Sequence, residues 1–173
     1  METPLNGPDV GPPTLERIRR APKVLLHDHL DGGLRPSTII ELADETGYAD
    51  LPTTDADELA AWMLRGANRK DLTLYLETFA HTVGVMQTAP AIERVARECA
   101  EDLATDGVVY AEIRFAPELH TERGLSLDAV IEAVITGFEA GASGTDLTIR
   151  IICSAMRHLD RGLEVAQAAV RHR

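Results

Sequence analysis

The stretch Val24-Leu25-Leu26-His27-Asp28-His29-Leu30-Asp31-Gly32-Gly33 determines how the rest of the chain can be interpreted. Its apolar run predicts a β-strand, and side chains in a strand alternate between two faces, so His27 and His29 should point the same way, about 7 Å apart. Asp31 continues that face, and the two glycines let the backbone turn and a ligand approach. Two imidazoles at the end of a strand, followed by an acid, favour a metal site over a structural pair of histidines. Asp28 points the opposite way, and we expect it to be solvated or to face a helix.

Length and composition narrow the class of protein. The chain has 173 residues, of which 45% are hydrophobic, enough for one domain with a core. Its 28 acidic and 17 basic residues give a net charge of −11, which argues against nucleic acid and anionic membranes as partners. No apolar stretch approaches the length of a membrane span, and residues 1–22, rich in proline and glycine, lack a signal-peptide core and predict a flexible lead-in. The two cysteines have no Cys-x-x-Cys spacing, which favours a reduced, cytoplasmic setting.

Hydrophobic periodicity predicts an alternation of strands and helices. After the first strand we expect helices over about 36–46, 55–66, 72–86 and 90–106, and then a strand over 108–115. A helix from Ser126, a strand over 147–153 and a helix over 163–170 follow. This order predicts an α/β fold with about three parallel strands. Three strands cannot close a barrel, and a (β/α)₈ barrel takes about 250 residues. The chain is therefore either a small three-stranded sheet or the N-terminal part of a TIM-type barrel over residues 23–173, and the ligands favour the second.

The strand over 108–115 has one apolar and one polar face. The apolar face should contain Val109, Ala111, Ile113 and Phe115, and the polar face Tyr110, Glu112 and Arg114. In a parallel barrel the polar face points into the interior below an active site, where Glu112 and Arg114 could support residues that bind a ligand. A plain structural ion pair between them is the favoured interpretation.

We expect structural or surface roles for Cys99 and for His81, His120 and His158. His81 is expected to be a partly solvated surface residue, and Cys99 lies on the apolar stripe of its helix. His120 and His158 could in principle complete a metal site, but we expect both to be structural.

Four motifs in order resemble the adenosine deaminase family of zinc hydrolases. The first is the strand motif from Val24 to Gly32, which neighbouring amidohydrolases share. The others are Leu72-Thr73-Leu74-Tyr75-Leu76-Glu77-Thr78-Phe79, which resembles the helical lid over the purine pocket, the second-strand motif from Val108 to Pro117, and Cys153-Ser154-Ala155-Met156-Arg157-His158 at the end of the third strand. The resemblance covers essentially residues 22–173.

The resemblance implies roles for individual residues. His27 and His29 would be the two first-strand ligands of Zn²⁺, and Asp31 would accept a hydrogen bond from a ribose hydroxyl, with His29 near the same substrate group. Tyr75 and Leu76 would form part of an apolar gate over the purine pocket, although an ordinary core role is nearly as plausible. The implied reaction is zinc-dependent hydrolysis of adenosine or deoxyadenosine at the purine 6-amino group, releasing ammonia.

The resemblance also implies what to expect of this stretch of chain by itself. The family's other zinc ligands, its general-acid glutamate and its catalytic histidine lie on later strands, so no catalytic residue is assigned here. Because a catalytic zinc needs at least three protein ligands, we expect the isolated chain neither to deaminate adenosine nor to fold stably. The alternatives are a related zinc aminohydrolase for adenine, AMP or a modified adenosine, and a truncated non-catalytic paralogue that binds a purine or a partner.

Overall fold

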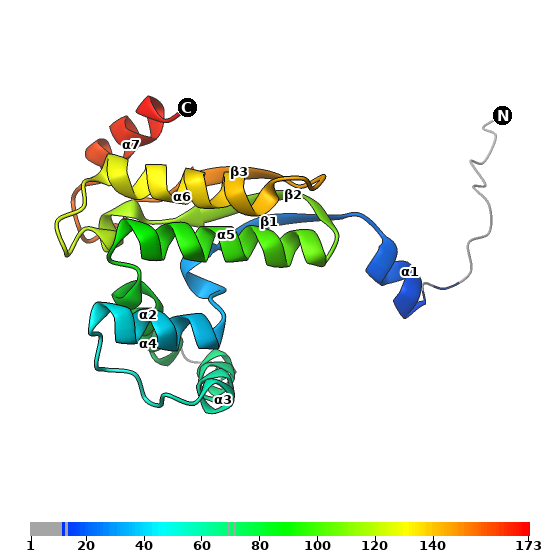
Figure 1. Cartoon of the computed structure of the whole chain (residues 1–173). Helices are drawn as coiled ribbons and strands as arrows, with labels where there is room; N and C mark the ends of the chain where they lie inside the picture. Colours follow the sequence, from blue (N-terminus) through cyan, green and yellow to red (C-terminus); the bar gives the residue numbers. More distant parts are fainter. Residues whose placement is uncertain (1–11, 13, 69, 71) are drawn as a thin grey trace.

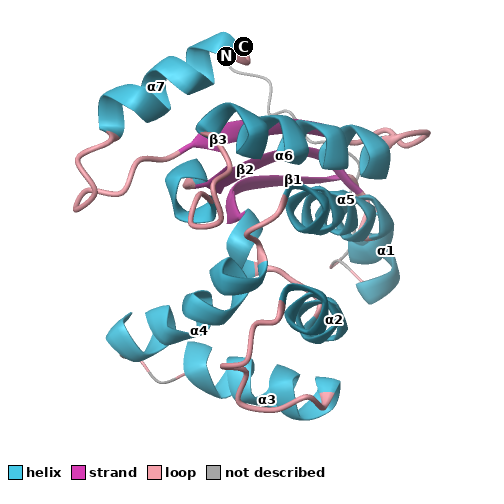
Figure 2. Ribbon diagram, turned by 60° about the vertical axis from the view of Figure 1, so that its left-hand side comes forward, coloured by secondary structure: helices cyan, strands magenta, loops and turns pink. Residues whose placement is uncertain are grey.

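The computed structural model describes residues 12, 14–68, 70 and 72–173, and its centre is a parallel sheet. Strands β1 (Lys23–His29), β2 (Val108–Phe115) and β3 (Thr148–Cys153) lie in the order β1-β2-β3, and both neighbouring pairs are parallel. Figure 2 shows the three strands side by side with helices around them. The expected α/β layout with three parallel strands is confirmed.

Two long helices cover one face of this sheet. Helices α5 (Ala89–Thr105) and α6 (Leu127–Ala142) lie against each other and against the strands (Figure 1). Each begins at a residue whose hydroxyl accepts a hydrogen bond from a first-turn amide, Thr88 for α5 and Ser126 for α6. Between helices and sheet lies the core, which includes Ile92, Val95, Ala111, Ile113, Phe115, Val130 and Val134.

Three further helices lie between β1 and α5 in sequence. The short 3₁₀ helix η1 (Leu30–Gly32) leads into α2 (Pro36–Thr46), α3 (Ala56–Ala67) and α4 (Leu72–Val85), which extend away from the sheet in both views (Figures 1 and 2). Gly47 ends α2 with a φ of 69°, and the side chain of Asp55 caps α3 by accepting from the amide of Glu58. Helix α4 ends one residue before the predicted boundary. The helices predicted over about 36–46, 55–66 and 72–86 are therefore present.

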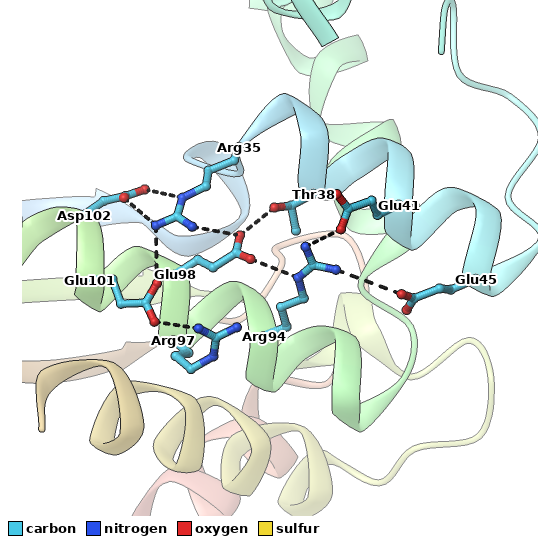
Figure 3. Close-up of polar contacts among 9 residues, drawn as sticks. All are labelled: Arg35, Thr38, Glu41, Glu45, Arg94, Arg97, Glu98, Glu101 and Asp102. Atoms are coloured by element: carbon cyan, nitrogen blue, oxygen red, sulfur yellow. Dashed lines mark hydrogen bonds and ion pairs between the residues drawn. The ribbon is translucent and has the colours of Figure 1, made fainter. Parts of the chain in front are cut away.

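A polar network fastens α2 to α5 (Figure 3). At its centre the buried carboxylate of Glu98 accepts hydrogen bonds from Thr38 Oγ1 at 2.6 Å and from Arg94 Nε at 2.9 Å. Arg35 adds a two-pronged pair with Asp102, at 2.6 and 3.0 Å. Since Arg35 follows Asp31 by four residues, this network also fixes the turn that leaves the end of β1.

The ends of the described chain carry shorter helices. Helix α7 (Gly162–Arg171) follows β3 and contacts α6, with Asp128 accepting from Arg171 Nη2 at 2.8 Å. Helix α1 (Leu15–Arg20) was not anticipated. Most of the predicted flexible lead-in, residues 1–11 and 13, lies outside the described residues, so its flexibility stays a prediction.

The two faces of β2 differ from the prediction at two points. Ala111, Ile113 and Phe115 are buried as expected, but Val109 is 37% exposed, at the point where the register with β1 shifts and Val109 has no paired residue. The predicted ion pair between Glu112 and Arg114 is wrong: the Glu112 carboxylate accepts a hydrogen bond from the Tyr110 hydroxyl at 3.0 Å, and Arg114 turns to other partners. Glu112 is engaged by Tyr110, its other neighbour on the polar face, and Arg114 instead reaches sideways to His27 on β1 and to Ser154 after β3.

Candidate functional site

The end of β1 does not continue as a regular strand. Its pairing with β2 shifts register between Leu25 and Asp28, and within that bulge His27 has a φ of 64°, in the left-handed region. Backbone strain of this kind costs about 1–2 kcal/mol and is concentrated at functional sites. The simple alternation assumed from the sequence is therefore wrong at His27. The bulge nevertheless brings the two rings together, because the centroids of His27 and His29 are 5.6 Å apart.

Asp28 lies close enough to helix α5 for its charge to act on Cys99, which agrees with one of its two expected positions, facing a helix. One of its carboxylate oxygens accepts from the amide of His29 at 2.9 Å. Burial, and secondly the negative charge of Asp28, raise the pKa of the Cys99 thiol on α5 to about 12. Cys99 is thus a protonated thiol packed against the core, as predicted.

Asp31 is a buried carboxylate beside His29. It lies in η1, only 5% exposed, with Oδ1 3.8 Å from Nδ1 of His29. Burial raises the pKa of this carboxyl, while a backbone amide and the neighbouring His29 oppose the shift. Among the described residues Oδ1 has no hydrogen-bond partner. A buried acceptor without a donor is costly, so this oxygen is suited to receive one from a ligand.

The two residues His29 and Asp31 line one cavity of about 480 Å³. Tyr75 and Leu76 from α4 lie on its wall and are 38% and 53% exposed. Sequence reasoning did not assign a site role to Phe79, yet it lines the cavity and its ring contacts two of the predicted site residues. Its ring stands edge-on to both Tyr75 and His29, with centroids 5.3 and 6.3 Å apart. The helical spacing of 75, 76 and 79 was the available signal.

Arg114 and Ser154 complete the polar lining of the same cavity. Nη1 of Arg114 lies 2.8 Å from Nε2 of His27, and its Nη2 lies 3.0 Å from Oγ of Ser154. The sequence placed Arg114 on the polar face of its strand but linked it to Glu112. Only the pairing of all three strands shows that it reaches His27 on one side and Ser154 on the other.

The remaining histidines lie outside this cavity. His120, in the 3₁₀ helix η2 (Pro117–His120), is fully buried, and its Nδ1 lies 3.1 Å from the carbonyl oxygen of Met86. His158 is exposed on the loop after β3. His81 is half-buried, in agreement with the partly solvated position expected for it, and its Nδ1 lies 3.0 Å from the Tyr48 hydroxyl.

The donor set at the end of β1 fits part of a zinc site. Neutral imidazole nitrogens are preferred zinc ligands, and two of them converge here. Within the described residues no group of three or more His, Cys, Asp or Glu side chains is placed to hold a metal. His27 and His29 therefore supply two ligands of a set that needs at least three.

Comparisons with known proteins agree on one family. The family model described as adenosine deaminase matches residues 22–173. A curated adenosine deaminase of Mycolicibacterium gilvum is 62% identical over 167 residues, which are 94% of this chain and 46% of that protein. The chain thus spans about half the length of the curated relatives it matches.

No helix among the described residues is long and apolar enough to cross a membrane.

Solved structures share the same architecture. An adenine deaminase from Arthrobacter aurescens aligns with a TM-score of 0.73 and 29% identity, over 87% of this chain and 46% of its own. An amidohydrolase from Burkholderia ambifaria with bound zinc aligns with a TM-score of 0.70 and 25% identity, over 94% of this chain and 43% of its own. The fold corresponds to about half of a TIM-barrel deaminase, as the sequence predicted.

Proposed function

This chain belongs to the adenosine deaminase family, and we propose that it contributes to the zinc-dependent hydrolytic deamination of adenosine or deoxyadenosine. The observation that carries the proposal is the convergence of the His27 and His29 rings at the end of β1, where His29 and Asp31 border one 480 Å³ cavity. A metal ligand pair beside a buried carboxylate with a free acceptor oxygen suits a polar, neutral substrate such as a nucleoside.

We assign a role to each of the predicted site residues. His27 and His29 hold Zn²⁺, which when bound acidifies a water molecule and so supplies the nucleophile. Asp31 accepts a hydrogen bond from a ribose hydroxyl, which gives its unpartnered oxygen a donor. Tyr75 and Leu76 cover the purine and exclude water, and the edge-on contact with Phe79 holds the Tyr75 ring in place.

The setting we propose is the cytoplasm, in purine metabolism, with a small purine nucleoside as the partner. The net charge of −11 is unfavourable for binding nucleic acid. Cys99 and Cys153 are both free thiols, which suits a reducing compartment.

A segment exchange tests this function. Residues 22–173 replace the matching segment of the M. gilvum relative, and the chimera is loaded with zinc. We expect adenosine to be converted to inosine, measured as a fall in ultraviolet absorbance with release of ammonia. His27→Ala and His29→Ala should each abolish turnover and reduce bound zinc, because each removes a ligand.

Matched substitutions separate these roles from folding. His158→Ala removes an exposed histidine outside the cavity and should leave both zinc content and turnover unchanged. Asp31→Asn should raise the KM for adenosine, whereas Asp28→Asn, on β1 and outside the residues that line the cavity, should not. A folded chimera that turns over adenosine equally well without His27 would show that the proposed site is wrong.

Adenine is the second candidate substrate, favoured by the similarity to the A. aurescens adenine deaminase. Adenine has no ribose, so Asp31→Asn would then leave KM unchanged. Comparing adenosine, adenine and AMP as substrates of the same chimera distinguishes these candidates.

A further inference from the structure

Arg114 is held on two sides at the site. Its Nη1 lies 2.8 Å from Nε2 and 3.3 Å from Nδ1 of His27, and its Nε and Nη2 lie 3.3 and 3.0 Å from Oγ of Ser154. The three residues come from three different elements: β1, β2 and the turn after β3. Among the described residues no carboxylate pairs with this guanidinium, although it is half-buried. Its shortest polar contact is therefore with the imidazole of His27.

The chemistry of the two groups fixes which atom donates. A guanidinium carries only N–H donors and keeps its charge at any physiological pH, so it can only donate to the ring. The ring nitrogen that faces it must present a lone pair, and a neutral imidazole has one such nitrogen. The shorter contact identifies Nε2 as that acceptor, which leaves the proton of His27 on Nδ1.

A metal ion needs the same lone pair. If Zn²⁺ binds Nε2, the guanidinium has to leave that atom; if it binds Nδ1, the ring must first change tautomer, which the contact with Arg114 opposes. In both cases the positive charge of Arg114, 2.8 Å from Nε2 and 3.3 Å from Nδ1, also repels the incoming cation. Ser154 provides a neutral acceptor on which Arg114 can remain after it has released His27.

We propose that Arg114 is an internal competitor for the metal: its guanidinium holds the ligand lone pair of His27, and Zn²⁺ must displace it to bind. This inference rests on the proposed function, since it takes His27 as a zinc ligand. Arg114 is on this view a positioning residue that sets the zinc affinity and the rate of zinc uptake.

The test measures zinc binding to the chimera described above, which supplies the further ligands that a zinc site needs, by competition with a chromophoric chelator and without any activity assay. Arg114→Met keeps the length of the side chain and removes its charge and donors. We expect this variant to bind zinc about tenfold more tightly than the chimera with Arg114. A tenfold change is at the lower end of the effect of removing one charge-assisted hydrogen bond that competes with the metal. Arg150→Met is the matched control: it removes an exposed arginine from the neighbouring strand, beside Glu112, and should change the affinity by less than about twofold.

A second readout follows the ring itself. In the metal-free chain, the ¹⁵N shifts of the His27 imidazole should show a protonated Nδ1 and a lone pair on Nε2, and this preference should weaken in Arg114→Met. Far-ultraviolet circular dichroism checks that each variant is folded. If Arg114→Met does not fold, Arg114→Gln takes its place in the same chimera.

The outcomes separate the two proposals. Zinc binding that is lost in His27→Ala and strengthened in Arg114→Met supports both the site and the competitor. Zinc binding that is lost in His27→Ala but unchanged or weakened in Arg114→Met overturns the competitor and leaves the proposed function intact. Zinc binding that survives in His27→Ala, or no zinc binding in any variant, refutes the metal site and the competitor together.

Discussion

His120 should make the stability of the fold depend on pH in a predictable window. Its imidazole is fully buried, with Nδ1 3.1 Å from the carbonyl oxygen of Met86, and Nε2 has no hydrogen-bond partner among the residues that the structure describes. Burial lowers the pKa of this histidine from 6.5 to about 4, and the hydrogen bond to Met86 offsets only part of that effect. The ring therefore stays neutral in the folded chain at pH values where it is charged in the unfolded chain.

The direction and size of the pH effect on the free energy of unfolding follow from the difference between the folded and unfolded pKa values of His120. Because the folded pKa is depressed, the stabilising contribution is fully present above pH 6.5 and is lost as the pH falls toward 4. Each pH unit in this window removes about 1.4 kcal/mol, so the loss amounts to about 3 kcal/mol in total. That is a large part of the stability of a domain of this size.

Urea unfolding between pH 7.5 and pH 4.5 measures the effect. In His120→Asn the side-chain amide can still donate to Met86, but it does not titrate, so the variant should lack this share of the pH dependence. It should be less stable than the unmodified chain at pH 7.5, because the smaller side chain leaves a cavity, and the difference should shrink as the pH falls. His158→Asn, on the exposed loop, is the control and should behave like the unmodified chain. Parallel stability curves for His120→Asn and the unmodified chain would refute the reasoning.

Two further predictions concern the contacts between helices. A Cβ at Gly137 of α6 would lie 2.3 Å from a carbonyl oxygen of α5, so Gly137→Ala should lower the free energy of unfolding in urea by about 2–3 kcal/mol. A Cβ at Gly33 would meet no atom of the described residues within 4 Å, so Gly33→Ala should cost less than about 0.5 kcal/mol. Equal costs for the two variants would contradict the close packing of α5 and α6. Glu98→Gln should cost about 2–4 kcal/mol, because the Glu98 side chain is only 8% exposed and its loss of charge leaves two arginines without their buried partner. Glu41→Gln, at 56% exposure, should cost less than about 1 kcal/mol, and a Glu98 variant no less stable than this one would show that the network does not fasten α2.

Local pattern was enough to predict the elements and their order. Strand β2 matches its prediction to the residue, and α5 and α6 begin next to the proline and serine that marked their starts. The bulge at His27 could not be predicted in this way, because it arises from the register between β1 and β2, which pair residues more than eighty positions apart. The partners of Arg114 were missed for the same reason. A side chain on the polar face of a strand chooses among neighbours that only the assembled sheet provides.

The identity of the metal ligands is the claim on which the account depends most. Crystals of the zinc-loaded chimera, measured at the zinc absorption edge, locate the ion directly by anomalous scattering. We predict one strong peak about 2.0–2.1 Å from a ring nitrogen of His27 and from a ring nitrogen of His29, with Arg114 turned away toward Ser154. A peak bonded to other residues, or one bonded to His29 while His27 remains with Arg114, would contradict the account.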